Sequence, residues 1–242
     1  MHINARSLSR NLDALVSELS LLSNMPSVIA VTDTWAITVN DSVPIPGYTS
    51  IIKARKNRPG GVVGLYIQDA LNFSYKLRPD LSTDTTSESL FIQLTNNKYK
   101  NVIIGVIYKP PDSDVTKFTK SIEQLLNIVT KEHRPCYLMG DFNIDLLKNN
   151  KHFPTQYFVD VLISSGFYPL IIRPTRITEN FATLIDNIFT NVHDVHIKPG
   201  IWIVDISDHL PVLAILSSKF KNCKTKKVVA KQDFRQTNVD KF

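Results

Sequence analysis

The spacing of apolar residues along the chain alternates between a period typical of helices and one typical of strands. Apolar residues three or four positions apart predict helices near residues 12–22, 118–129 and 153–162, and Gly166 would end the last of these. Short runs rich in β-branched and aromatic residues predict strands between them. The predicted strands cover residues 27–32, 48–54, 61–67, 89–94, 102–108, 136–140, 185–189, 201–204 and 211–216.

Many short strands with a few interleaved helices indicate an α/β fold in which helices cover two packed β-sheets. The chain has 242 residues, of which 43% are hydrophobic, and this is enough for one large buried core. The apolar pattern stops after Ser217, so we predict a domain over residues 1–218 and a tail over residues 219–242. No apolar run reaches the length of a membrane span, and the first residues lack the pattern of a signal peptide.

The positive charge of the chain is concentrated in that tail. Residues 217–242 contain eight basic and two acidic residues, which equals the whole net charge of +6, whereas residues 1–218 contain 20 of each. A basic tail suits contact with nucleic-acid phosphates, and a solvated linker is the alternative that the composition leaves open. Cys136 and Cys223 form neither a zinc pattern nor a disulfide framework, which favours a nuclear or cytoplasmic protein over a secreted one.

Several polar residues with catalytic potential stand at predicted strand ends. Asp141 and Asn143 follow a strand directly and are two residues apart, a spacing that lets both side chains point the same way. Asp186 lies at the edge of an apolar run and needs a partner, for which a histidine such as His209 is suitable. Taken one at a time, these segments are also typical of turns or of surface positions.

The order of these segments along the chain resembles the endonucleases of LINE-type non-LTR retrotransposons. These belong to the endonuclease/exonuclease/phosphatase superfamily, with the apurinic/apyrimidinic endonucleases and deoxyribonuclease I. The resemblance covers roughly residues 2–217. It rests on Asn4-Ala5-Arg6-Ser7-Leu8, Thr32-Asp33-Thr34-Trp35, Gly60-Gly61-Val62, Ile107-Tyr108-Lys109-Pro110-Pro111, Gly140-Asp141-Phe142-Asn143-Ile144-Asp145, Arg173-Pro174-Thr175-Arg176, Leu184-Ile185-Asp186-Asn187-Ile188-Phe189-Thr190 and Ser207-Asp208-His209-Leu210-Pro211.

The resemblance implies a four-layer sandwich, with two mainly antiparallel sheets flanked by helices, and a site for Mg²⁺ that Mn²⁺ could also fill. Asn4 and Asp33 would help to hold the metal, and Asp208 would lie near it. Tyr108 would bind the scissile phosphate, Asp141 would activate the attacking water, and Asn143 would support the phosphate oxygens. His209 would contact the phosphate, with Asp186 holding its ring. An oxygen-rich set of ligands is what a hard cation requires.

Two positions depart from the family pattern. The family has Glu where this chain has Asp33, and the shorter side chain is expected to displace the metal or weaken its binding. The family's first strand also begins several residues before its Asn, whereas only three residues precede Asn4 here. We therefore expect this strand to fray and to hold Asn4 poorly.

The resemblance implies an enzyme that nicks one strand of double-stranded DNA and leaves a 3′-hydroxyl that primes reverse transcription. The expected protein is a monomer without membrane contact, and a reverse transcriptase domain would accompany it in a longer parent protein. A catalytically impaired, DNA-binding remnant is the alternative, and a phosphorylated lipid or small molecule is a third, less favoured substrate. The residues predicted to contact DNA are Lys53, Arg55, Lys56, Arg58, Thr175 and Arg176.

Overall fold

The computed structural model describes residues 1–34, 43–53, 63–83, 86–96, 99–194 and 196–216. Three α-helices lie in these ranges, α1 (Leu8–Ser20), α2 (Val115–Glu132) and α3 (Phe153–Ser164), with short 3₁₀ helices at Asp69–Leu71, Pro79–Leu81 and Leu146–Lys148. The strands are β1 (His2–Asn4), β2 (Val28–Thr32), β3 (Tyr48–Lys53), β4 (Val63–Gln68), β5 (Ser74–Leu77), β6 (Glu88–Asn96), β7 (Tyr99–Tyr108), β8 (Cys136–Asp141), β9 (Tyr168–Pro169), β10 (Arg176–Ile177), β11 (Ala182–Thr183), β12 (Asp186–Thr190), β13 (Ile197–Ile201) and β14 (Val212–Leu216).

Twelve of these strands form two six-stranded sheets. The first has the order β13-β14-β1-β2-β4-β3 and the second the order β5-β6-β7-β8-β12-β9. Among the described strands, only β1 with β2 and β7 with β8 pair in parallel, and the other pairings in these sheets are antiparallel. The α/β fold with two packed, mainly antiparallel sheets is therefore confirmed.

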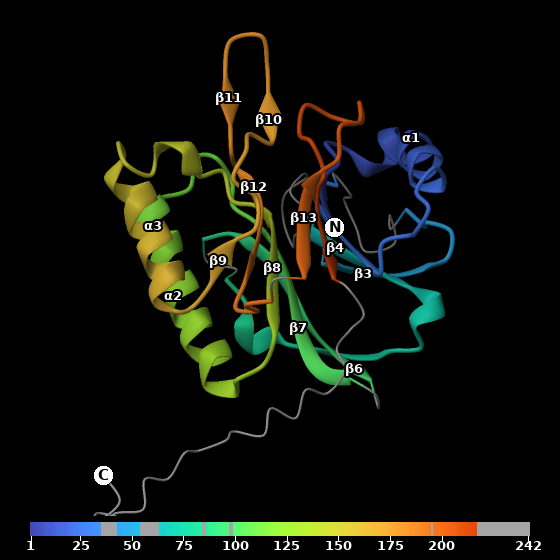
Figure 1. Cartoon of the computed structure of the whole chain (residues 1–242), viewed down its shortest axis with the longest axis horizontal. Coiled ribbons are helices and arrows are strands. Elements are labelled where there is room, and N and C mark those ends of the chain that lie inside the picture. Colours follow the sequence, from blue (N-terminus) through green and yellow to red (C-terminus); the bar gives the residue numbers. More distant parts are fainter. Residues whose placement is uncertain (35–42, 54–62, 84–85, 97–98, 195, 217–242) are drawn as a thin grey trace, which may run out of the picture.

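The molecule has four layers, because each sheet has a helix-covered face and a face that packs on the other sheet (Figure 1). Leu8, Leu15 and Leu19 place α1 on the outer face of the first sheet. The outer face of the second sheet packs against α2 and α3. A middle cluster, which includes Leu65 of β4 and Val106 of β7, fills the space between the sheets. The layers are thus joined by three apolar clusters, and the polar site lies at strand ends.

The structure corrects two expectations for the strands. The strand predicted at residues 201–204 is instead β13 at Ile197–Ile201, an edge strand whose Pro199 and Gly200 obscure the apolar alternation. The first strand does not fray, since β1 has β14 on one side and β2 on the other. Asn4 at its end is only 3% exposed and is held in place.

A short hairpin formed by β10 and β11 projects beyond the sheets, near the start of β12 (Figure 1). None of the helices among the described residues is long and apolar enough to cross a membrane. The predicted tail, residues 219–242, and the segment 54–62, which contains Arg55, Lys56 and Arg58, lie outside the described residues.

Candidate active site

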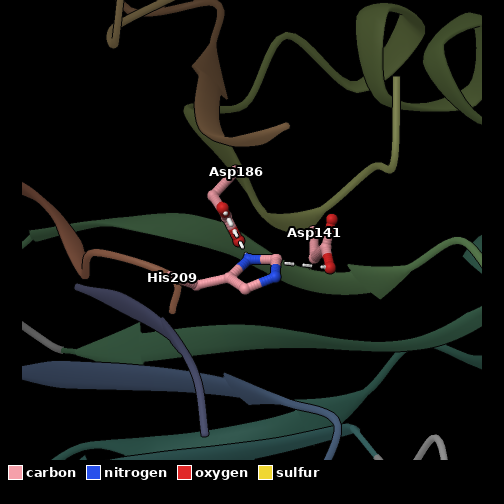
Figure 2. Close-up of side chains that lie close together, drawn as sticks. All are labelled: Asp141, Asp186 and His209. Atoms are coloured by element: carbon pink, nitrogen blue, oxygen red, sulfur yellow. Dashed lines mark hydrogen bonds and ion pairs between the residues drawn. The ribbon is translucent and has the colours of Figure 1, made fainter. Parts of the chain in front are cut away.

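Three buried side chains converge where β8 ends and β12 begins. Asp141 is the last residue of β8 and Asp186 the first of β12, and they stand directly opposite each other in this antiparallel pair. His209 enters from the segment before β14 and lies beside both carboxylates (Figure 2). Its Nδ1 is 2.9 Å from Asp186 Oδ2 and 4.0 Å from Asp141 Oδ2. The structure thus brings together three of the residues that the sequence singled out.

Hydrogen bonds from two asparagines fix the Asp141 carboxylate. The Asn4 amide donates to Asp141 Oδ2 over 2.9 Å, and so does the Asn143 amide over 3.3 Å. The backbone N–H of Asn143 donates to Asp141 Oδ1 over 3.0 Å. Asn143 adopts a left-handed conformation with φ of 46°, which Asn tolerates better than most residues and which turns both of its donors toward Asp141. These contacts orient the carboxylate before any substrate binds.

The electrostatics of the cluster follow from burial and from the pairing of two carboxylates. Burial, aided by the negative charge of Asp186, raises the pKa of Asp141 to about 7, a value suited to a general base near neutral pH. Burial alone would lower the pKa of His209. The hydrogen bond to Asp186 and the charges of Asp186, Asp141 and Asp208 outweigh that effect and raise this pKa above its ordinary value. The cluster therefore favours a protonated His209 imidazole, hydrogen-bonded to the Asp186 carboxylate.

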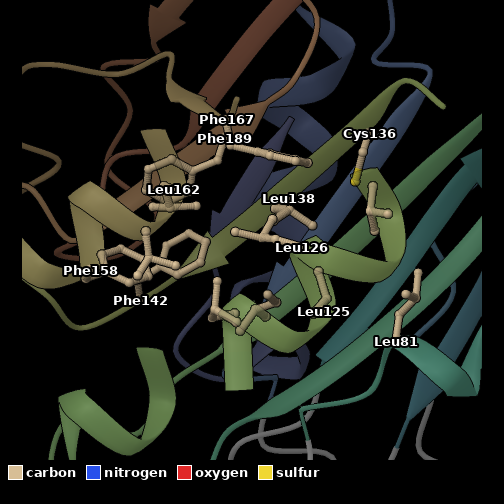
Figure 3. Close-up of a cluster of buried hydrophobic side chains, with 14 of the residues drawn as sticks. Leu81, Leu125, Leu126, Cys136, Leu138, Phe142, Phe158, Leu162, Phe167 and Phe189 are labelled. Carbon is tan, nitrogen blue, oxygen red and sulfur yellow. The ribbon is translucent and has the colours of Figure 1, made fainter. Parts of the chain in front are cut away.

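An aromatic cluster anchors the segment that carries Asp141 and Asn143. Phe142, the residue between them, is 2% exposed and points away from the site into the core under α2 and α3 (Figure 3). Its ring centroid lies 4.8 Å from that of Phe189 in an edge-on contact and 5.9 Å from that of Phe158. Packing of this kind restrains the loop, so the two polar neighbours keep their positions.

Asp186 is held by a residue that the sequence had assigned to DNA. Thr175 is fully buried, and its hydroxyl donates to Asp186 Oδ2 over 2.8 Å while accepting the backbone N–H of Asp186 over 3.1 Å. This corrects the expectation that Thr175 would contact DNA, because the side chain has no exposed surface to offer. Its hydroxyl instead fixes the carboxylate that orients His209.

The other predicted catalytic and metal residues border this cluster. Asp33 follows β2, the parallel neighbour of β1, so it lies at the same sheet edge as Asn4. Its φ of 55° is left-handed. Tyr108 ends β7 in register with Asp141. Both Asp33 and Tyr108 are half-buried.

Asp208 lies between two arginines. Its Oδ1 is 3.0 Å from Arg6 Nε and its Oδ2 is 2.8 Å from Arg176 Nε. One carboxylate therefore pairs with two guanidinium groups, and these three side chains together carry one net positive charge. Arg176 also forms an isolated backbone bridge with His209, which fixes the corner to the cluster. The sequence predicted Arg176 as a DNA contact and Asp208 as a neighbour of the metal, but it did not predict Arg6.

Lys53, another predicted DNA contact, reaches from β3 to the second sheet. Its ammonium donates to the carbonyl of Ser89 over 3.0 Å and to the hydroxyl of Ser82 over 3.3 Å. The remaining predicted contacts in this group, Arg55, Lys56 and Arg58, lie outside the described residues.

Comparison with known proteins yields no matching family model and no matching curated protein. Solved structures do match. The endonuclease domain of TRAS1, a telomere-specific non-LTR retrotransposon, has a TM-score of 0.69 at 14% identity, over 89% of this chain and 96% of that one. An AP endonuclease from Archaeoglobus fulgidus has a TM-score of 0.62 at 15% identity, over 89% and 97%. A 3′ phosphatase from Neisseria, solved with a product DNA hairpin, has a TM-score of 0.62 at 17% identity, over 89% and 98%.

The chain has the endonuclease/exonuclease/phosphatase fold. At these identities the likeness concerns the fold, so the chemistry must be argued from the residues themselves.

The side chains on this fold fit a hard divalent cation. Within the part of the chain that the structure describes, ligand atoms of Asp141, Asp186 and His209 all lie within 4.8 Å of one another and form a candidate metal site. Asn4 ends β1 and Asp33 follows the end of its parallel neighbour β2, and the Asn4 amide oxygen accepts the backbone N–H of Arg6 over 3.2 Å. Such oxygen-rich surroundings suit Mg²⁺ or Mn²⁺. Asp186 Oδ2 already contacts His209 Nδ1, so this carboxylate oxygen is better placed to orient the ring than to bind a cation.

Two buried residues of the site were missed by the sequence reasoning. Lys109 follows Tyr108, is fully buried, and donates from its ammonium to the carbonyl of Pro110 over 3.0 Å. Burial lowers the pKa of this lysine. His2 stands two residues before Asn4 and is 1% exposed. The signal for His2 was available, since residues two apart on a strand face the same side.

Proposed function

We propose that the protein is a Mg²⁺-dependent DNA endonuclease that nicks one strand by phosphodiester hydrolysis and leaves a 3′-hydroxyl for target-primed reverse transcription. The observation that carries the proposal is the pairing of Asp141, held by two asparagines, with a His209 ring held by Asp186. Hydrolysis of a phosphodiester needs an oriented water and neutralisation of the charge that develops on the phosphate. This pairing supplies groups for both tasks.

Each residue has a role that its contacts allow. Asp141, with a pKa near neutrality, would accept a proton from the attacking water. His209 uses Nδ1 for Asp186 and leaves Nε2 for a phosphate oxygen. Tyr108 would donate to the phosphate. The Asn143 amide donates to the carbonyl of Lys109 and to Asp141, and it would support the phosphate oxygens by exchanging its longer bond, the one to Asp141, for one to the phosphate. When bound, Mg²⁺ would supply positive charge opposite the phosphate oxygens, and Asn4 and Asp33 would hold it, with Asp208 close by.

Support for a DNA substrate comes from charge and from the matched structures. The pair of arginines at Asp208 borders the site, and the tail carries the excess positive charge of the chain. One matched protein is the endonuclease domain of a retrotransposon, and another was solved with product DNA. We extend both properties to this chain as part of the proposal, with a reverse transcriptase domain as its expected companion.

Plasmid nicking tests this function directly. We expect the protein to convert supercoiled plasmid to the open circle with Mg²⁺ and not with EDTA, and the nicks to be extendable by a DNA polymerase. An impaired remnant is the second candidate, favoured by Asp33 in place of Glu, and it would bind DNA without nicking at any concentration of Mg²⁺ or Mn²⁺. Absence of both nicking and DNA binding would contradict both candidates.

Removal of residues 219–242 should weaken DNA binding and flatten its salt dependence, with little change in the nicking rate at saturating DNA. The slope of log K against log salt should become shallower by about 0.9 for every DNA phosphate that the tail no longer neutralises. The measurement is fluorescence anisotropy of a labelled duplex over a range of salt. A full-length variant with the eight basic tail residues changed to Gln separates charge from length. An unchanged slope in both variants would show that the tail is only a linker.

A further inference from the structure

Strand β1 presents two polar side chains to the site, and the proposed mechanism uses only one of them. His2 and Asn4 alternate with Ile3, which packs outward among the residues that contact α1. The two inward side chains reach the two carboxylates that stand opposite each other across β8 and β12. Asn4 donates to Asp141, and His2 lies beside Asp186. His2 is therefore placed to hold the Asp186 carboxylate, as Asn4 holds that of Asp141.

The ring of His2 has one satisfied nitrogen and one that faces the site. Nε2 is 3.1 Å from the hydroxyl of Thr32, whereas Nδ1 is 3.9 Å from Asp186 Oδ1. Both Nδ1 and that carboxylate oxygen are buried, and neither has a hydrogen-bond partner among the described residues. The Thr32 hydroxyl can donate to Nε2, which places the single N–H of a neutral ring on Nδ1, the nitrogen that faces Asp186. Leaving two buried polar atoms unsatisfied is costly, and a small ring rotation or one bridging water would join them.

The two oxygens of the Asp186 carboxylate differ in their contacts: Oδ2 has two partners, whereas Oδ1 has no hydrogen-bond partner among the described residues. Asp186 Oδ2 contacts both the Thr175 hydroxyl and His209 Nδ1. A contact on Oδ1 would stop the carboxylate from rotating about its bond to Cβ. Because the position of the His209 ring depends on that carboxylate, a restraint on Oδ1 would be transmitted to the ring.

We propose that His2 is a positioning residue that donates from Nδ1–H to Asp186 Oδ1, directly or through one water, and so fixes the carboxylate that orients His209. The inference rests on the proposed function, since it gives His2 a part in that reaction. It also makes a structural claim that holds without any reaction. In the alternative, His2 only fills space and binds Thr32 through Nε2.

Two near-isosteric variants separate these alternatives. The amide of Asn can occupy the place of a histidine Nδ1, and that of Gln can occupy the place of Nε2. His2→Asn should keep the hydrogen bond with Asp186 and abolish the one with Thr32, and His2→Gln should do the reverse. We expect His2→Gln to lower the turnover number roughly tenfold with little change in KM for DNA, and His2→Asn to remain near wild type. Thermal unfolding of each variant controls for loss of the fold.

Nitrogen-15 NMR of the histidine rings tests the contact without relying on activity. In the wild type, we expect the proton of His2 to be on Nδ1, and the low-field proton of His209 Nδ1 to persist in His2→Asn but shift or broaden in His2→Gln. A wild-type His2 protonated on Nε2, or equal effects of the two substitutions, would overturn the proposal. If the wild type does not nick, the proposed function fails, whereas the wild-type spectrum still decides the role of His2.

Discussion

Substitution of Asp141 with Asn should lower the nicking rate by at least about a hundredfold, because it removes the base that accepts the proton of the attacking water. The amide keeps the size of the side chain, and its oxygen can still accept from the Asn4 and Asn143 side chains. Only the bond from the backbone N–H of Asn143 is lost, so the fold should survive. His209→Ala should have an effect of similar size, since it removes the imidazole that would contact the phosphate through Nε2. The measurement is single-turnover nicking of a supercoiled plasmid, with circular dichroism to verify the fold.

The same substitution should stabilise the metal-free protein at neutral and higher pH. The pKa of Asp141 is about 7 in the folded state, above the ordinary value of 3.8, so the folded protein binds this proton more tightly than the unfolded chain. The stability linked to this group is therefore fully present below pH 3.8 and is lost as the pH rises to about 7. Asp141→Asn should abolish that loss, and the measurement is the midpoint of thermal unfolding in EDTA between about pH 5 and pH 8.

A matched control is Asp160→Asn, which makes the same chemical change at an exposed position on α3. It should alter neither the nicking rate nor the pH dependence of stability. Near wild-type nicking by a folded Asp141→Asn protein would contradict the mechanism. If Asp141→Asn raised stability without loss of activity, the raised pKa of Asp141 would have no role in catalysis.

The layers of the fold could be predicted from the sequence because the three α-helices found in the described ranges, and most of the strands there, bury a regular apolar face. The strands that the sequence did not predict bury few side chains. Strand β5 is exposed along its length, β13 contains Pro199 and Gly200, and β10 and β11 contribute only two residues each to a projecting hairpin. At such positions the pairing of backbone groups defines the strand, and side-chain periodicity carries little information.

The candidate site was predictable where chemistry and strand ends coincide, as at Asp141, Asn143, Asp186 and His209. Residues that act through these groups were harder to identify. Thr175 is 0% exposed and contacts Asp186 only because the chain folds back at the start of β12. The two arginines at Asp208 come from segments 170 residues apart, which no local pattern can join. Buried hydrogen bonds of this kind depend on tertiary contacts.

Asp33→Glu tests the one position at which the chain departs from the metal ligands of the family that it resembles. We expect this variant to nick faster by roughly tenfold to a hundredfold, because a carboxylate displaced by about 1 Å is costly at a site that needs accurate geometry. Ordinary Asp and Glu carboxyls titrate at similar pH, so the change concerns reach more than charge. Half-maximal nicking should also require less Mg²⁺, and the advantage of Mn²⁺ over Mg²⁺ that we expect in the wild type should diminish.

The left-handed backbone conformation at residue 33 disfavours the longer Glu side chain. Asp33 has a φ of 55°, a left-handed conformation that Asp adopts more readily than residues with longer side chains. Asp33→Glu should therefore cost up to about 1 kcal/mol of stability while raising activity, whereas Asp33→Asn should retain the fold and lose activity. The measurements are nicking rates against Mg²⁺ and Mn²⁺ concentration, together with thermal unfolding. If the metal curves of wild type and Asp33→Glu coincide and the wild type is already fast, the left-handed turn brings the shorter carboxylate close enough, and reach is not a defect of this site.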